Sequence, residues 1–260
     1  MTPLFNRYST GSRTVAISGK MKIEFETIGI VRSPYKEKFG VPRQPGLVPQ
    51  AKGRVELLPP YNCVEAVSGL EGYSHIWLQF VFDRSLCERW QPTVRPPRLG
   101  GNRRVGVFAS RSPFRPNPIG LSVVQLERVV SEGGEVTLEI AGLDLVDGTP
   151  VLDVKPYVAY VDSIPGASSG FAAAAPGPLF RVHFSSKALN QLAARPDGKT
   201  LREMIRALLE TDPRPAYIKD GRQQRVYGIR LYDFDLRWRI ADGAAEVLEL
   251  AQPNHCSAEM

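Results

Sequence analysis

Residues 119–158 have the sequence IGLSVVQLERVVSEGGEVTLEIAGLDLVDGTPVLDVKPYV. Three segments of this stretch, 119–129, 135–141 and 151–158, are rich in β-branched residues that alternate with polar ones. Such alternation is typical of half-buried β-strands, and glycine, aspartate and proline between the segments mark turns. No helical pattern separates the strands, so they are expected to form an antiparallel sheet or barrel.

The same pattern continues toward the N-terminus. It predicts strands at residues 22–31, 54–58, 76–82 and 104–109, with a short helix at residues 64–73. The chain is therefore expected to be mainly β, with a first domain at residues 22–165. Residues 1–21 are rich in Ser, Thr, Gly and Arg and are expected to be a disordered leader.

Residues 166–178, GASSGFAAAAPGP, have no periodicity and are interpreted as a linker. After it, residues 179–252 are expected to form a small α+β domain. Its predicted strands are 180–184, 226–231, 234–240 and 246–250. Ser185 and Thr200 are expected to cap two helices, and Asp242–Gly243 is expected to form a hairpin turn.

Composition narrows the class of protein. The chain of 260 residues has a net charge of +6, which favours an anionic partner such as nucleic acid. Its three cysteines are widely spaced and its three histidines form no ligand motif, so disulfides and a metal site are not expected. No apolar run is long enough to cross a membrane, and a reducing cytoplasmic location is expected.

Residues 84–118 carry eight arginines, no lysine and one acid, Glu88. A solvated surface normally mixes charges of both signs, although a random charged face remains an alternative. Arginine suits bidentate phosphate contacts and base stacking, and the prolines in SRSPFRPNP (residues 110–118) make the loop rigid. The segment therefore fits an RNA-binding groove.

Residues 143–157 contain three aspartates near a glycine and two prolines. They form either an Asp-Gly turn with solvated acids or a loop whose carboxylates face a cationic ligand. A stretch after the linker, DPRPAYIKDGRQQRVYG (residues 212–228), interleaves basic residues with tyrosines. It suits phosphate contact with base stacking, or a surface salt-bridged to Asp212 and Asp220.

Four strings carry a family resemblance: IGIVRSPYKEKFGVPRQPG, GLEGYSHIWLQFVFDR, RPPRLGGNRRVGVFASRSPFRPNPIGLS and LDLVDGTPVLDVKPY. Together with residues 212–228, they resemble the TrmO, or TsaA-like, family. The resemblance implies a TsaA-like β-barrel domain that binds S-adenosylmethionine, a homodimer, and a tRNA anticodon stem-loop as partner. It implies methyl transfer to N6 of threonylcarbamoyl-adenosine at tRNA position 37, immediately 3′ of the anticodon. The competing hypothesis is a non-catalytic RNA-binding or S-adenosylmethionine-sensing module.

The resemblance also implies site residues, although no catalytic base stands out. The cofactor pocket is expected to use Pro45, Gly46, Leu47, Asp83, Arg84, Arg111, Leu121, Asp144, Leu145, Val146 and Asp147. The RNA contacts are expected from Arg115, Arg214, Tyr217, Lys219, Arg222, Arg225 and Tyr227. A chain cut near Ser163 is then expected to bind the cofactor but to bind tRNA weakly.

Overall fold

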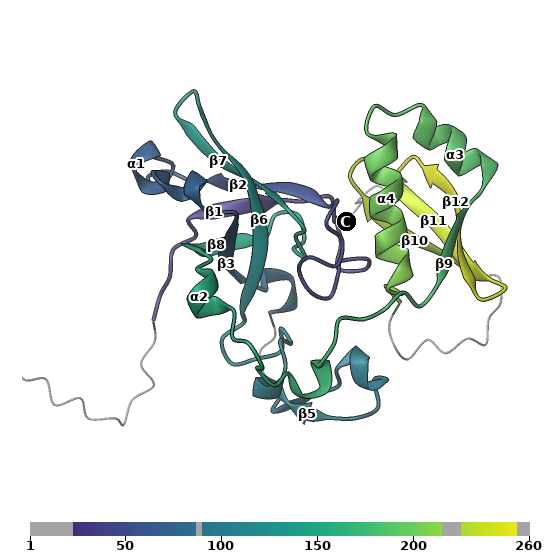
Figure 1. The fold of residues 1–260 in the computed structure, drawn as a ribbon, viewed down its shortest axis with the longest axis horizontal. Helices are drawn as coiled ribbons and strands as arrows, with labels where there is room; N and C mark the ends of the chain where they lie inside the picture. Colours follow the sequence, from purple (N-terminus) through teal and green to yellow (C-terminus); the bar gives the residue numbers. More distant parts are fainter. Residues whose placement is uncertain (1–22, 87–89, 215–224, 254–260) are drawn as a thin grey trace, which may run out of the picture.

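The first part of the chain is a closed antiparallel β-barrel (Figure 1). The structure is a computed structural model that describes residues 23–86, 90–214 and 225–253. Around the barrel the strand order is β1-β2-β7-β6-β3-β8, and the β1–β8 pair closes it. The strands are β1 (Gly29–Arg32), β2 (Lys52–Leu57), β3 (His75–Val81), β6 (Ile119–Glu132), β7 (Glu135–Ala141) and β8 (Pro150–Pro156). The mainly β prediction is therefore confirmed.

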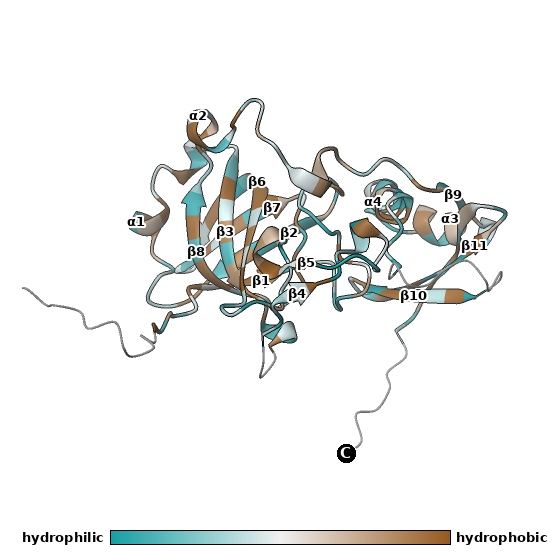
Figure 2. Ribbon diagram, turned by 90° about the horizontal axis from the view of Figure 1, so that it is seen from below, coloured by the Kyte–Doolittle hydropathy of each residue, from teal (hydrophilic) through white to brown (hydrophobic). Residues whose placement is uncertain are grey.

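Alternating side chains explain the barrel. In β3, Ile76, Leu78 and Phe80 are buried, whereas the residues between them are partly exposed. The long strand β6 follows the same rule, and hydrophobic segments alternate with hydrophilic ones along the strands in Figure 2. Because a closed sheet leaves no unpaired edge, the buried face can form one continuous core.

Two short strands and two short helices accompany the barrel. The strands β4 (Thr93–Val94) and β5 (Val105–Gly106) pair with each other away from it, and the helices are α1 (Val64–Val67) and α2 (Ala159–Asp162). None of the described helices is long and apolar enough to cross a membrane.

The second part is a four-stranded sheet with two helices. Its strand order is β10-β11-β12-β9, in which only the β12–β9 pair is parallel. The elements are β9 (Arg181–Phe184), α3 (Ser186–Ala193), α4 (Gly198–Glu210), β10 (Val226–Leu231), β11 (Phe234–Ala241) and β12 (Ala244–Ala251). The side chains of Leu236 and Trp238 are fully buried in its core. The expected α+β architecture is confirmed.

Local predictions in this part were mostly right. The Ser185 hydroxyl accepts a hydrogen bond from Ala188 N at 3.0 Å, so it caps α3 as expected. Asp242 and Gly243 have φ of +50° and +73°, as a tight hairpin turn requires. The predicted cap at Thr200 is wrong, because α4 begins at Gly198 and Asp197 occupies the capping position.

Two strand predictions in the first part were too long. The strand expected at residues 22–31 is only β1, because residues 23–28 precede it without strand structure and are mostly exposed. The strand expected at residues 104–109 shrinks to β5, and a 3-10 turn at Val107–Ala109 replaces the rest.

The two parts are joined by more than the connecting segment. The loop between β1 and β2 packs against β10, where Tyr35 and Leu231 form a β-bridge. Tyr232 N donates to Pro34 O at 2.8 Å, and an Arg43 guanidinium nitrogen donates to Arg214 O at 2.9 Å. The loop therefore connects β1 to β2 in the first part and also packs against the second part.

Candidate active site

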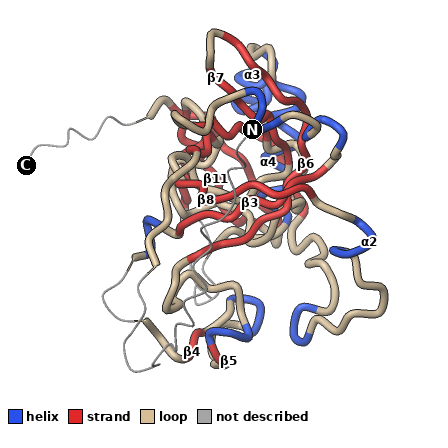
Figure 3. Tube along the Cα trace, turned by 90° about the vertical axis from the view of Figure 1, so that its left-hand side faces the viewer, coloured by secondary structure: helices blue, strands red, loops and turns tan. Residues whose placement is uncertain are grey.

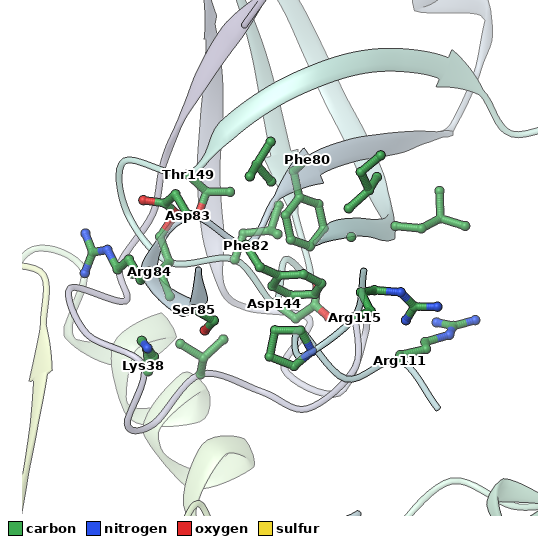
Figure 4. Close-up of a pocket in the computed structure, with 18 of the residues that line it drawn as sticks. Lys38, Phe80, Phe82, Asp83, Arg84, Ser85, Arg111, Arg115, Asp144 and Thr149 are labelled. Atoms are coloured by element: carbon green, nitrogen blue, oxygen red, sulfur yellow. Dashed lines mark hydrogen bonds between the residues drawn. The ribbon is translucent and has the colours of Figure 1, made fainter. Parts of the chain in front are cut away.

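A pocket of about 610 Å³ lies at one end of the barrel, where β3 ends and β6 begins. Figure 4 shows Arg111 and Arg115 on one side of it and Lys38 and Arg84 on the other, with Phe80 and Phe82 between them. The walls come from four loop segments and two strand ends. The lining residues are Lys38, Val41, Pro42, Arg43, Gln44, Phe80, Val81, Phe82, Asp83, Arg84, Ser85, Ser110, Arg111, Pro113, Arg115, Asn117, Ile119, Gly120, Leu121, Asp144, Leu145, Val146 and Thr149.

Most of the predicted cofactor residues meet in this pocket. Those that line it are Asp83, Arg84, Arg111, Leu121, Asp144, Leu145 and Val146. Pro45, Gly46, Leu47 and Asp147 are not among the lining residues. Gly46 N donates to Gly142 O at 2.8 Å. This bond holds the Pro45–Leu47 turn beside the start of the loop that carries Asp144 and Asp147.

The Asp147 carboxylate connects its own loop to the segment that follows β1. Its Oδ1 accepts a hydrogen bond from Ser33 N at 2.8 Å, and its Oδ2 pairs with Lys36 Nζ at 3.0 Å. Arg84 adds to the same junction by donating to Lys36 O at 2.9 Å and to Asp147 O at 2.7 Å. Both side chains therefore position the wall loops.

Asp144 is the buried carboxylate of the pocket. Burial raises the pKa of Asp144 to about 6, although a hydrogen bond from the Ser122 hydroxyl and the nearby Arg111 charge act in the opposite direction. Arg111 itself donates to Gln44 Oε1 at 2.8 Å, which joins the proline-rich loop to the loop after β1. A buried acid of this kind is suited to a cationic ligand.

An aromatic pair forms the wall between the charged groups. The rings of Phe80 and Phe82 meet edge to face, with centroids 5.0 Å apart. Gly120 makes room for them, since a Cβ at that position would lie 2.1 Å from Phe80 Cζ. Neither phenylalanine was among the predicted site residues, because apolar residues in a strand are ordinarily core residues. The family strings that contain them were the available signal.

The predicted RNA-contact residues divide into four groups. Arg115 lines the pocket and donates to Ser110 O at 3.2 Å. Arg214 is only 5% exposed, pairs with Asp212 at 2.8 Å and lies over the rings of Phe180 and Tyr227. Its guanidinium is therefore largely buried and held by Asp212 and the two rings.

Tyr227 is also buried and stacks on Trp238 with ring centroids 5.0 Å apart. Arg225 is exposed and lies over the Tyr227 ring at 5.3 Å. The remaining predicted residues, Tyr217, Lys219 and Arg222, lie outside the described residues. Among the described residues, no three His, Cys, Asp or Glu side chains are grouped as metal ligands.

Comparison with known proteins identifies the family. Residues 30–163 match the profile of the tRNA-methyltransferase O N-terminal domain, and residues 177–253 match that of the TrmO C-terminal domain. The chain belongs to the TrmO family. Every residue that lines the pocket falls within the N-terminal TrmO match, and β9–β12 fall within the C-terminal one.

Relatives agree with this over nearly the whole chain. An Escherichia coli protein named tRNA (adenine(37)-N6)-methyltransferase is 51% identical over 87% of this chain and 97% of its own length. A Pseudomonas aeruginosa protein provisionally named an S-adenosylmethionine-dependent methyltransferase is 50% identical over 81% of this chain and 90% of its own. The crystal structure of TrmO from Pseudomonas aeruginosa superposes with a TM-score of 0.72 at 40% identity, covering 89% of this chain and 99% of that one.

Proposed function

We propose that this protein methylates N6 of threonylcarbamoyl-adenosine at position 37 of the tRNA anticodon stem-loop. At the coarser level, the protein is an S-adenosylmethionine-dependent tRNA (adenine(37)-N6)-methyltransferase. The observation that carries this function is 51% identity to the Escherichia coli enzyme, spread over both domains. The threonylcarbamoyl group and the stem-loop are the proposed refinements.

The pocket suits S-adenosylmethionine. Its volume of about 610 Å³ is in the ordinary range for a small-molecule site. The Phe80 and Phe82 rings offer an apolar wall for a purine, and the buried Asp144 carboxylate offers a counter-charge for a cation. Bound S-adenosylmethionine supplies a methyl group on a positively charged sulfur, which is already a good methyl donor.

The chain's own work is therefore mainly positioning. Fixing the nucleophile in line with the donor can lower a barrier by ~7–11 kcal/mol. The hydrogen bonds of Arg84 and the Arg111–Gln44 contact hold the four wall segments in one arrangement. Arg111 and Arg115 stand beside the pocket, where a carboxylate of the threonylcarbamoyl group would find bidentate donors.

We also propose the division of the chain. Residues 22–165 would bind S-adenosylmethionine, residues 166–178 would link, and residues 179–252 would contribute tRNA binding. Pro45, Gly46, Leu47 and Asp147 would support the pocket, and Arg225 with the undescribed Tyr217, Lys219 and Arg222 would contact RNA. A homodimer in the cytoplasm completes the proposal.

The function is tested by methyl transfer from labelled S-adenosylmethionine to tRNA. Two matched substrates are needed, with and without threonylcarbamoyl on adenosine 37, and the label is located by nuclease digestion. We expect label at position 37 of the modified tRNA alone. Equal labelling of both tRNAs would remove the threonylcarbamoyl refinement, and no labelling of either would favour the non-catalytic module.

A pH prediction follows from Asp144. Its pKa of about 6 means that the carboxyl gains a proton as pH falls through that value. A bound cation favours the ionised form, so cofactor affinity is expected to be roughly tenfold weaker at pH 5 than at pH 7. Calorimetry should show this slope lost in Asp144→Asn and retained in Asp83→Asn, a matched change of another pocket carboxylate. An unchanged slope in Asp144→Asn would assign the titration elsewhere.

A further inference from the structure

Residues 90–115, here called the basic lobe, form a small unit beside the barrel. Its β4–β5 ribbon pairs Thr93 with Gly106 and Val94 with Val105. Val107 N donates to Pro92 O at 3.0 Å, and Gln91 N donates to Phe114 O at 3.4 Å. Figure 3 shows β4 and β5 below the barrel strands.

Within the described residues, the basic lobe is rich in positive charge, and Arg111 is the one of its arginines whose charge acts on a neighbouring carboxylate, that of Asp144. The lobe has six arginines and no aspartate or glutamate. Of these, Arg98 donates to Ala174 O, and Arg104 donates to Thr93 Oγ1 at 3.0 Å. Both of these acceptors are neutral. In the part of the chain that the structure describes, none of the six forms an ion pair with a carboxylate.

Some arginines outside the lobe are paired with carboxylates. On the sheet of the second domain, Arg230 pairs with Asp235, Arg237 with Glu249 at 3.7 Å, and Arg239 with Glu246 at 2.7 Å. Those charges are compensated by neighbours on the same sheet. Among the described residues, Arg181, Arg202 and Arg206 also form no ion pair with a carboxylate. The lobe differs in that it gathers six arginines and no acid in one segment, where an anionic partner would supply the missing negative charge.

The lobe also exposes aromatic rings. Trp90 is 48% exposed and Phe108 is 74% exposed, and their rings stack with centroids 6.5 Å apart at 21°. Both rings are therefore on the surface and not in a core. Aromatic faces among arginines are the combination that binds unpaired bases and their phosphates.

The lobe leads directly to the pocket. Ser110, Arg111, Pro113 and Arg115 belong to the lobe and line the pocket wall. In the sequence, Phe108 precedes this wall by two residues, and the exposed Phe114 stands between the lining residues Pro113 and Arg115. An RNA strand bound along the lobe would therefore bring a neighbouring base to the pocket mouth.

We propose that the basic lobe is a docking surface for the single-stranded anticodon loop of the substrate tRNA, with Trp90 and Phe108 stacking on unpaired bases. This inference rests on the proposed function. It favours a looped strand over a duplex, because only unpaired bases expose a face for stacking. It favours RNA over a second copy of the chain, because the chain is itself basic at net +6.

The test uses the full-length protein and two RNAs of equal length, an anticodon stem-loop and an uninterrupted duplex. Trp90→Ala with Phe108→Ala is expected to weaken stem-loop binding at least about fivefold, the lower end for one base–aromatic stack. Duplex binding should change far less. Phe108→Tyr in place of Phe108→Ala should restore most of the affinity, because the ring is kept. Tyr160→Ala is the matched control, since that ring is 89% exposed and lies outside the lobe.

The arginines are tested by salt dependence. Arg98→Gln with Arg103→Gln is expected to flatten the slope of log affinity against log salt by about 0.7 per lost contact. Arg128→Gln is the matched control, since that charge is already paired with Glu139 at 2.9 Å. Cofactor affinity, measured by calorimetry, should stay at the wild-type value in all these variants.

Each outcome decides something. If both sets of variants bind the stem-loop with the affinity and salt slope of the wild type, the docking surface is wrong. Methyl transfer by the unaltered protein would still support the proposed function. A changed oligomeric state without changed RNA affinity would assign the surface to a second copy instead. Failure of the unaltered protein to methylate tRNA would count against the proposed function and not against the lobe's RNA affinity.

Discussion

Replacing Gly120 by valine is expected to lower turnover on tRNA at least ~100-fold, because small misplacements in a site have effects of that size. Gly120 is buried in β6, and a Cβ there would lie 2.1, 2.3 and 2.7 Å from three atoms of the Phe80 ring. The ring is part of the pocket wall and packs on Phe82. It must move, and cofactor binding should be lost with it.

The measurements for Gly120→Val are cofactor affinity by calorimetry, turnover with tRNA and thermal unfolding. Gly228→Ala is the control, since Gly228 also lies in a strand and has open space where a Cβ would be. Overpacking commonly costs ~1–3 kcal/mol of stability, so the variant should unfold earlier than the wild type. Adding Phe80→Leu should recover part of the cofactor affinity. A stable Gly120→Val protein with normal affinity would contradict the role assigned to this wall.

The alternation of side chains was enough to predict most of the strands. Strand β7 occupies the predicted residues 135–141, and β10 the predicted residues 226–231. Each of these strands buries one face, so hydrophobic residues recur at every second position of its sequence. The same pattern could not decide whether the sheet closes into a barrel, because closure depends on β1 pairing with β8 across more than a hundred residues. The parallel β9–β12 pair is hidden for the same reason.

The pocket shows where prediction from sequence stops. Asp144 and Asp147 belong to one short loop, and both were expected at the cofactor. The structure turns Asp144 toward the pocket and Asp147 toward Ser33 and Lys36. That difference is set by the backbone of the loop and not by residue type. The burial of Arg214 could not be predicted from the sequence either, since it depends on Asp212 and on two rings that approach only in the folded domain.

The junction between the domains changes what is expected of a truncated chain. The pocket residues Lys38, Arg43 and Gln44 lie on the loop that packs against the second domain. Arg43 donates to the backbone oxygens of Asp212 and Arg214, at 3.3 and 2.9 Å. A chain cut near Ser163 would lose these supports. The cofactor affinity that the sequence analysis expected such a chain to keep should therefore fall.

Gly40→Ala tests this coupling in the intact chain. Gly40 has φ of +93°, and a Cβ there would lie 2.4 Å from Ile229 Cγ2 in the second domain. Backbone strain of ~1–2 kcal/mol and overpacking of ~1–3 kcal/mol should together shift the docked state by ~30-fold or more. Because the same loop lines the pocket, we expect cofactor affinity and tRNA turnover to fall together.

Gly69→Ala separates the two causes, since Gly69 has a similar φ of +84° but nothing near a Cβ. That variant should bind the cofactor normally. The double variant Gly40→Ala with Ile229→Ala removes the clash and should regain most of the lost affinity, leaving only the backbone strain. If Gly40→Ala weakened tRNA turnover but left cofactor affinity intact, the second domain would act on RNA alone. If both fell and the double variant restored both, the docked second domain would be part of what shapes the cofactor pocket.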